Sequence, residues 1–223
     1  MIDLTPLWLT LRLALIVTVI LMLIGAPIAW WLSQSTSRLK PAFEAVIAMP
    51  LVLPPTVLGF YLLLIMNPTA PIGAFWLNLT GDTLTFTFAG LVVASIVYSL
   101  PFAIQPMQAS FEKIPRATME AAASLGARPL DAFFSVAAPL SVRGFVTAAV
   151  LSFAHTLGEF GVVLMVGGNI PGETRVVSIA IYESVETLQY HEAHALAAIL
   201  LVISFAVLLF VYAFNHYRPR YGV

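Results

Sequence analysis

The stretch LALIVTVILMLIGAPIAWWL, from Leu13 to Leu32, decides the fold class of this chain. A helix needs about 20 predominantly apolar residues to cross a bilayer, and this run supplies them without a single charge. The rest of the 223-residue chain has the same character, since 60% of it is hydrophobic and only 9% is charged. In soluble domains about a quarter of the residues are charged. The composition therefore predicts an all-α protein that crosses a membrane several times.

Four further apolar segments follow this run along the chain. The five predicted spans lie at about residues 7–33, 43–66, 84–107, 143–166 and 194–214. Pro54 and Pro55 interrupt the second span, and Glu159 lies inside the fourth. No linker or change of composition divides the sequence, so residues 1–223 predict one transmembrane domain with a single long loop at about 108–142.

Lysine and arginine are concentrated in alternate loops, and this asymmetry predicts the orientation of the spans. The loops after the first and third spans and the C-terminal tail contain Arg38, Lys40, Lys113, Arg116, Arg128, Arg143, Arg218 and Arg220. The other two loops contain only Arg175. Because basic loops stay on the cytoplasmic side, we expect the N-terminus outside and the C-terminus in the cytoplasm.

The long basic loop contains two short helical patterns. The segment EAAASLG, from Glu120 to Gly126, is made of good helix formers and ends in a glycine, which is typical of a helix end. Arg128–Pro129 predicts the start of a second helix. Its apolar residues at helical spacing are Leu130, Phe133, Phe134 and Ala137. From the residues alone, this loop is either an amphipathic connector in the headgroup region or a docking element for a cytoplasmic protein.

The same loop resembles the cytoplasmic signature of the inner-membrane subunits of binding-protein-dependent ABC importers, Glu-Ala-Ala-x-x-x-Gly followed by Ile-x-Leu-Pro. The matching residues are Glu120, Ala121, Ala122, Gly126 and Pro139, with Val136 in place of Ile and Ala138 in place of Leu. The resemblance implies a type I importer permease, in which short cytoplasmic coupling helices fit a cleft on the ATP-hydrolysing subunit. Small residues suit that role because they let another surface approach closely.

Two more segments, Met49–Leu63 and Ser152–Tyr182, resemble the permeases of molybdate importers and, more distantly, those of sulfate and thiosulfate importers. The resemblance implies a homodimer in the inner membrane of a bacterium, with two cytoplasmic ATPase subunits and an external oxyanion-binding protein. Molybdate, tungstate and sulfate share shape and charge, so the ion stays open. A stand-alone secondary transporter or channel is the main alternative from another class, although the chain shows no internal repeat of the kind common in secondary transporters. A membrane scaffold protein is a third possible functional class.

The sequence contains no ATP site of its own. A phosphate-binding loop needs Gly-Lys-Ser/Thr, and neither Lys40 nor Lys113, the two lysines of the chain, follows a glycine. We therefore expect a non-catalytic subunit driven by a separate ATPase. No cysteine and no metal-ligand spacing occur, so neither a metal nor a cofactor is expected. Ten basic residues nearly balance eleven acidic ones, and nothing indicates nucleic-acid binding.

Polar residues inside the predicted spans are candidates for the transport pathway or its gate. These candidates are Thr56, Ser152, Thr156 and Glu159. Helix packing is the competing role for Ser152 and Thr156, and a hydrogen bond to its own helix is the competing role for Thr56. A carboxylate in the pathway would repel a dianion, which favours a structural role for Glu159 over a gating role. We expect His155, one turn earlier, to form a hydrogen bond with Glu159.

Overall fold

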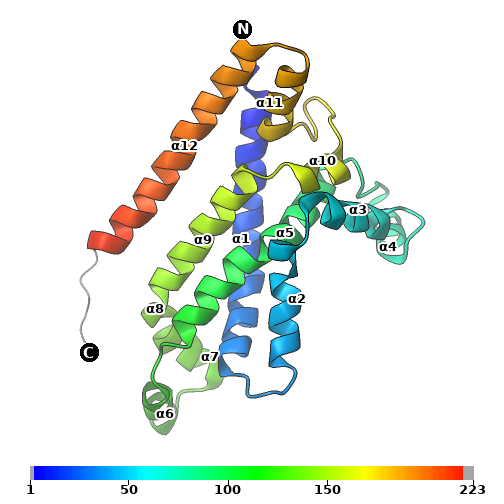
Figure 1. Ribbon diagram of the computed structural model, residues 1–223. Coiled ribbons are helices and arrows are strands. Elements are labelled where there is room, and N and C mark those ends of the chain that lie inside the picture. The colour runs from blue at the N-terminus through cyan, green and yellow to red at the C-terminus, as the bar shows by residue number, and fades with distance from the viewer. Residues whose placement is uncertain (1–2, 218–223) are drawn as a thin grey trace.

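Helices make up most of residues 3–217, the part of the chain that the computed structural model describes, and no strand occurs in that range (Figure 1). The first, third and fifth predicted spans correspond to α1 (Thr5–Gln34), α5 (Phe88–Phe111) and α12 (Tyr190–Tyr217). Within the described range, three helices are long and apolar enough to cross a membrane, and the number rises to five if each of two sharply bent helix pairs counts as one span. The all-α prediction is confirmed.

The second predicted span bends sharply at its prolines. Its two parts are α2 (Lys40–Val52) and α3 (Pro55–Met66), whose axes differ by 114°. Leu53 is extended (ψ 136°), because the ring of a following proline disfavours helical backbone in the residue before it. Pro50, in contrast, remains inside α2. The short helix α4 (Pro71–Thr80) follows α3, and Figure 1 shows both projecting sideways from the bundle.

The fourth predicted span, at about 143–166, is not one continuous helix. The helix α9 (Val142–Leu157) ends before Gly158, and a separate helix, α10 (Gly161–Gly167), packs against α3. Glycine permits this contact, since an added Cβ on Gly59 of α3 would lie 2.8 Å from Met165 Cβ, and one on Gly161 would lie 2.8 Å from Pro55 Cβ. Both breaks therefore meet at the same level of the molecule.

The core lies where α1, α5 and α9 pack together (Figure 1). Small residues recur every fourth position on the buried face of α9, at Gly144, Ala148, Ser152 and Thr156. An added Cβ on Gly144 would lie only 2.4 Å from Ser110 Cβ of α5. Close approach through small residues is the common means of helix association in membranes, where burial against water supplies no driving force between helices.

The long loop between α5 and α9 folds into four short helical pieces. They are α6 (Arg116–Ser124), α7 (Pro129–Ala132), the π-helix η1 (Phe133–Ala137) and α8 (Ala138–Leu140). Together, α7, η1 and α8 form the α7–α8 segment, which meets α9 at an angle of 74°.

The predicted apolar face of the α7–α8 segment is only partly buried. A π-turn winds with i→i+5 hydrogen bonds, which rotates the residues after it away from the α-helical register. Ala137 is buried and Phe133 packs on Trp30 and Phe111, whereas Leu130 and Phe134 stay 72% and 69% exposed. Pro139 lies inside α8, and the chain turns at Ser141.

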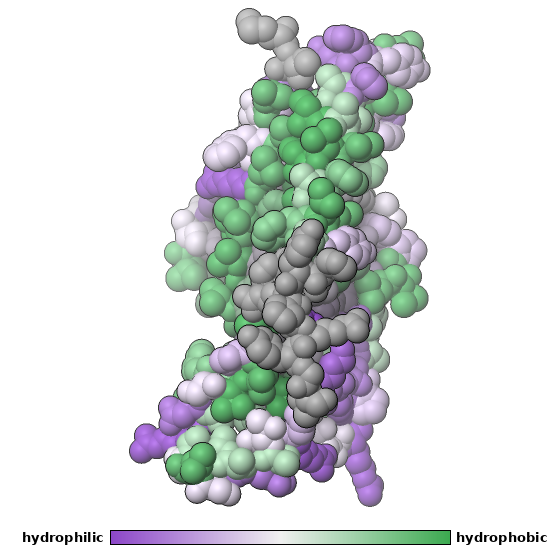
Figure 2. Space-filling view, turned by 90° about the vertical axis from the view of Figure 1, so that its left-hand side faces the viewer, coloured by the Kyte–Doolittle hydropathy of each residue, from purple (hydrophilic) through white to green (hydrophobic). Residues whose placement is uncertain are grey.

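The two ends of the molecule differ in what they contain. The start of α1, the short helix α11 (Val177–Glu186) and the start of α12 lie at one end, and α6 lies at the other (Figure 1). The backbone N–H of Val177 donates to Thr10 Oγ1 at 2.8 Å, which ties the beginning of α11 to α1. Figure 2 shows apolar side chains along the middle of one face and hydrophilic ones gathered toward both ends, the distribution expected of a bilayer-spanning protein.

Candidate functional site

The exposed helix α6 contains the Glu-Ala-Ala residues singled out in the sequence. Glu120 and Ala121 are exposed, Ala122 is half-buried, and no residue of α6 is fully buried. Gly126 ends the helix with φ 86°, the left-handed conformation that glycine adopts at no steric cost. Its N–H donates to Ala123 O at 2.9 Å and that of Ala127 donates to Ala122 O at 3.1 Å, the hydrogen-bond pattern of a Schellman motif. The helix end predicted at Gly126 is confirmed.

This geometry leaves a small-residue surface available to another protein. An added Cβ on Gly126 would meet nothing within 4 Å inside the chain. Pro139, the last residue of the sequence motif, is also exposed, but it lies in α8 rather than on α6. The residues of the motif thus belong to two elements, and only α6 presents a continuous helical face.

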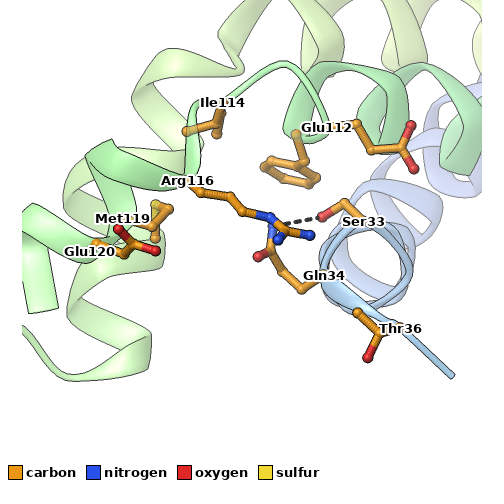
Figure 3. A pocket seen from close by; sticks show the side chains of 9 residues that line it. Ser33, Gln34, Thr36, Glu112, Ile114, Arg116, Met119 and Glu120 are labelled. Atoms are coloured by element: carbon orange, nitrogen blue, oxygen red, sulfur yellow. Dashed lines mark hydrogen bonds between the residues drawn. The ribbon is translucent and has the colours of Figure 1, made fainter.

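A polar cavity of about 430 Å³ lies between α6 and the nearby ends of α1 and α5. Figure 3 shows Arg116 extending from α6 toward Ser33 and Gln34 at the end of α1, with Glu120 and Met119 on the α6 side. The Gln34 side-chain amide donates to Ser33 Oγ at 3.3 Å. The cavity separates α6 from the ends of α1 and α5 over part of its length, so α6 is not packed tightly onto the bundle there.

Four polar residues connect the beginning of α2 to the end of α5, and we call them the polar staple. They are Lys40, Glu44, Gln108 and Glu112. Lys40 Nζ lies 3.1 Å from Glu112 Oε1, and the Gln108 amide donates to Glu44 Oε1 at 2.6 Å and to Glu112 Oε1 at 3.0 Å. The hydrogen bond from Gln108, followed by the bond and charge of Lys40, lowers the pKa of Glu112 against the effect of its partial burial.

Sequence reasoning missed the polar staple. Its only local signal was the i,i+4 spacing of Lys40 with Glu44 and of Gln108 with Glu112, which by itself indicates no more than a polar helix face. The pairing across the two helices depends on the packing of α2 against α5, which no local pattern reports.

A second cavity, of about 580 Å³, lies at the breaks of α2–α3 and α9–α10, and we call it the pathway cavity. Thr56, at the start of α3, and Glu159, between α9 and α10, both line it. Tyr98 and His155 contribute further polar groups. The structure thus brings together two of the four polar residues predicted for the pathway or gate, although they are about a hundred residues apart in sequence.

Ser152 and Thr156, the other two predicted residues, lie in the buried contact between α9 and α5. Thr156 donates its hydroxyl proton to Ser152 O at 2.9 Å, so it must accept from Ser99 Oγ, 3.0 Å away. Ser99 in turn accepts from His155 Nδ1 at 2.9 Å. This chain of bonds fixes the proton of a neutral His155 on Nδ1. The expected His155–Glu159 hydrogen bond is wrong, because Ser99 is the partner of His155.

Glu159 is the most deeply buried acidic residue of this region, with 3% of its surface exposed. Within residues 3–217, neither carboxyl oxygen has a hydrogen-bond partner, and the nearby Ser95 hydroxyl does not reach hydrogen-bond geometry. Its backbone carbonyl accepts from Ser178 Oγ at 2.5 Å, which fixes the α9–α10 connection to α11. The carboxyl oxygens are buried among helices rather than directed at solvent, and no group of three metal-ligating side chains occurs among the described residues.

Apolar helices that surround a polar break are typical of a membrane permease. The chain belongs to the family described as "Binding-protein-dependent transport system inner membrane component", which matches residues 22–220.

Known proteins that are similar to this chain over nearly its whole length indicate which members of the family it resembles. The chain is 55% identical over 216 residues to the molybdenum transport system permease protein ModB of Azotobacter vinelandii, a match that covers 97% of this chain and 96% of that protein. It is 32% identical over 212 residues to a probable sulfate transport system permease protein, cysT, of Chlorella vulgaris, covering 95% and 79%.

Solved structures agree with the fold. A bacterial ABC transporter that imports the acidic polysaccharide alginate superimposes with a TM-score of 0.76 at 16% identity, covering 95% of this chain and 78% of that one. The same kind of transporter in complex with a periplasmic protein bound to an alginate pentasaccharide gives 0.71 at 17% identity, covering 98% and 81%. At these identities the likeness concerns the fold alone.

Proposed function

We propose that this chain is the permease subunit of an ATP-driven importer that carries molybdate across the inner membrane. The observation that carries the proposal is the 55% identity, over 97% of the chain, to a molybdenum transport system permease. A sulfate or thiosulfate importer is the weaker candidate, because the sulfate permease relative is 32% identical. Tungstate has the same shape and charge as molybdate and is a further candidate cargo.

The proposed complex contains two copies of this chain, two cytoplasmic ATPase subunits and an external oxyanion-binding protein. Family membership supports a binding protein as a partner, since binding-protein-dependent transport is what the family description states. Glu120, Ala121 and Ala122 of α6 and Gly126 just after it would enter the ATPase, with Pro139 supporting the segment behind them. The chain itself takes no chemical part in ATP hydrolysis.

We propose that the polar staple passes movement of α6 to the pathway cavity. The end of α5 leads directly into the connection to α6, and Lys40 and Gln108 link that end to α2. The other end of α2 leads into the break at Leu53–Pro54 and then to Thr56 at the cavity. A rigid α2 would therefore transmit a displacement of α6 to the pathway, where Thr56 and Glu159 form the gate, while Ser152 and Thr156 hold α9 against α5.

An experiment on the native complex tests the proposed function. The chain, purified from its own membranes without cross-linking, is expected to bring an ATPase with it. Reconstituted with the binding protein, that complex should hydrolyse ATP faster with molybdate than without it. Stimulation by sulfate but not by molybdate would mean that the importer carries sulfate. Anion flux by this chain alone in liposomes would contradict the proposal.

We further propose that the N-terminus lies outside and α6 in the cytoplasm. The support is the basic composition of the end that carries α6 and the position of the N-terminal end of α1 opposite to it (Figure 1). The chain has no cysteine, so single cysteines can be introduced at Thr36 and Glu173, at opposite ends. An impermeant maleimide added to intact cells with a permeabilised outer membrane should label only the cysteine at position 173. Labelling only at position 36 would reverse the orientation.

A further inference from the structure

An apolar groove of about 670 Å³ lies between α1 and the α7–α8 segment, away from the pathway cavity. Its lining is mostly apolar and comprises Met22, Leu23, Ala26, Pro27, Trp30, Pro129, Leu130, Phe133, Phe134, Ala138 and Phe145. The residues of α1 in this lining lie 4 to 12 positions before Gln34, where α1 ends. At 1.5 Å per residue, they occupy about 6 to 18 Å of the helix axis inward from that end. This is the depth of the acyl chains just beneath the headgroups of one leaflet.

A basic residue adjoins the start of the segment that forms one wall of the groove. Arg128 directly precedes Pro129, which lines the groove, and is exposed. The one acidic side chain of the segment, Asp131, accepts the backbone N–H of Arg128 at 3.4 Å. The end of the groove at Pro129 therefore carries the positive charge of Arg128.

The size and depth of the groove decide between two kinds of occupant. A protein partner buries a broad surface, roughly 800 Å² on each side, whereas a concave space of a few hundred Å³ suits one small or chain-like molecule. A hydrocarbon chain fills an apolar space at this depth, and an arginine at its mouth favours an anionic headgroup.

We propose that the groove holds one acyl chain of an anionic phospholipid from the cytoplasmic leaflet, with Arg128 beside its phosphate. The choice of leaflet rests on the orientation proposed above. Phe133 and Ala137 already attach one side of the α7–α8 segment to the core. The lipid covers its other side, at Leu130 and Phe134, and so fixes the segment that follows α6.

Native mass spectrometry of the intact complex tests this proposal. The complex, with its ATPase, is reconstituted in nanodiscs of phosphatidylcholine and phosphatidylglycerol and then released. Wild type should retain one phosphatidylglycerol per copy of this chain. Ala138→Phe, which fills the groove, should abolish retention. Arg128→Gln should reduce the preference for phosphatidylglycerol about fivefold, the effect expected from one basic residue near the surface.

Two further variants keep the test decisive. Leu130→Glu places a negative charge on an exposed residue at the groove, so it should fold even if Ala138→Phe does not, and it should also lose the anionic lipid. Arg38→Gln removes an exposed arginine of the same end, outside the groove, and should retain the lipid as wild type does. The proposal would be overturned if wild type retained no lipid. It would also be overturned if Arg128→Gln and Leu130→Glu both retained as much phosphatidylglycerol as wild type.

Labelling distinguishes lipid from the ATPase as the occupant. A cysteine at Leu130 should react slowly with a maleimide in phosphatidylglycerol nanodiscs whether or not the ATPase is bound. Protection that requires the ATPase would show that a protein covers the groove and would also overturn the proposal. Molybdate-stimulated ATP hydrolysis is measured on the same samples. A complex that binds no lipid but is still stimulated by molybdate would contradict the lipid site and leave the proposed function intact.

Discussion

At the residue scale, Gly126 is the position whose backbone and surface both matter. Its φ of 86° disfavours any residue with a Cβ by roughly 1–2 kcal/mol, least for asparagine. Inside the chain, however, an added side chain has open space. The cost of a substitution there is therefore divided between local backbone strain and whatever surface binds α6.

We predict that Gly126→Asn unfolds at nearly the wild-type temperature yet couples poorly. The asparagine tolerates the left-handed backbone but adds bulk where the ATPase would approach. The measurement is the ratio of molybdate uptake to ATP hydrolysis in proteoliposomes, expected to fall several-fold. Gly81→Asn is the matched control, because Gly81 has φ 78°, equally open surroundings and a place at the end of α4. Normal coupling by Gly126→Asn would argue against docking at this surface.

Glu159 allows a second prediction at this scale. Because both of its carboxyl oxygens are buried out of contact with solvent, Glu159→Gln should change the molybdate concentration for half-maximal uptake by no more than about twofold. Thr56→Glu, by contrast, places a carboxylate on an exposed residue of the pathway cavity and should raise that concentration several-fold by repelling a dianion. A large gain in affinity for Glu159→Gln would mean that Glu159 faces the moving ion.

At the scale of elements, the contact between α5 and α9 depends on small residues. An added Cβ on Gly144 would lie 2.4 Å from Ser110 Cβ and 3.0 Å from the backbone oxygen of Pro106. Since backbone cannot yield cheaply, we predict that Gly144→Ala destabilises the protein by roughly 1–3 kcal/mol. Thermal unfolding in detergent measures this loss. Gly158→Ala, whose added Cβ would have no contact nearer than 3.9 Å, should unfold like wild type.

The polar staple between α2 and α5 gives a pH-dependent prediction. The pKa of Glu112 is lowered from its ordinary value of 4.5, chiefly by the Gln108 hydrogen bond, so the folded state favours the ionised carboxylate. Its stabilising contribution is complete above pH 4.5 and is lost as the pH falls through the lowered pKa. Gln108→Leu should lower the unfolding temperature slightly at pH 7, consistent with about 0.5 kcal/mol for exposed polar pairs. The difference from wild type should shrink on acidification below pH 4.5, and a constant difference would exclude this origin.

At the scale of the whole molecule, the apolar surface beside the pathway cavity bears on assembly. Val52, at the end of α2, is 84% exposed, and Met49 and Phe60 on the same helix pair are exposed as well. A pathway shared by two copies requires the faces that carry the cavity to meet around a twofold axis, so these residues should face their counterparts.

We predict that single cysteines at Met49, Val52 or Phe60 form disulfide-linked dimers when the membranes are oxidised. At least one of the three should cross-link, because neighbouring positions differ in distance from the axis and a disulfide needs Cα atoms within about 7 Å. Leu23→Cys, 71% exposed on the groove side of α1, should remain monomeric on a denaturing gel. Cross-linking of Leu23 alone would move the dimer contact to the other face.

The sequence by itself determined the membrane class, the distribution of charge between the two ends and the helix that ends at Gly126. These features follow from local chemistry: the length of an apolar run, the count of lysine and arginine in a loop, and the freedom of one glycine. The break of the second span was also predictable, because Pro54 and Pro55 act on their immediate neighbours. The family resemblance at Glu120–Gly126 rested on the same kind of contiguous pattern.

Tertiary structure alone decided how these elements meet. In the folded chain the fourth span is interrupted before Gly161, and Thr56 and Glu159 line one cavity. His155 forms its hydrogen bond with Ser99 rather than with Glu159. Tertiary structure also left Leu130 and Phe134 exposed while Phe133 packs on the core. Each outcome depends on which faces of distant helices come into contact, and a side chain takes its partner from that packing rather than from its neighbours in sequence.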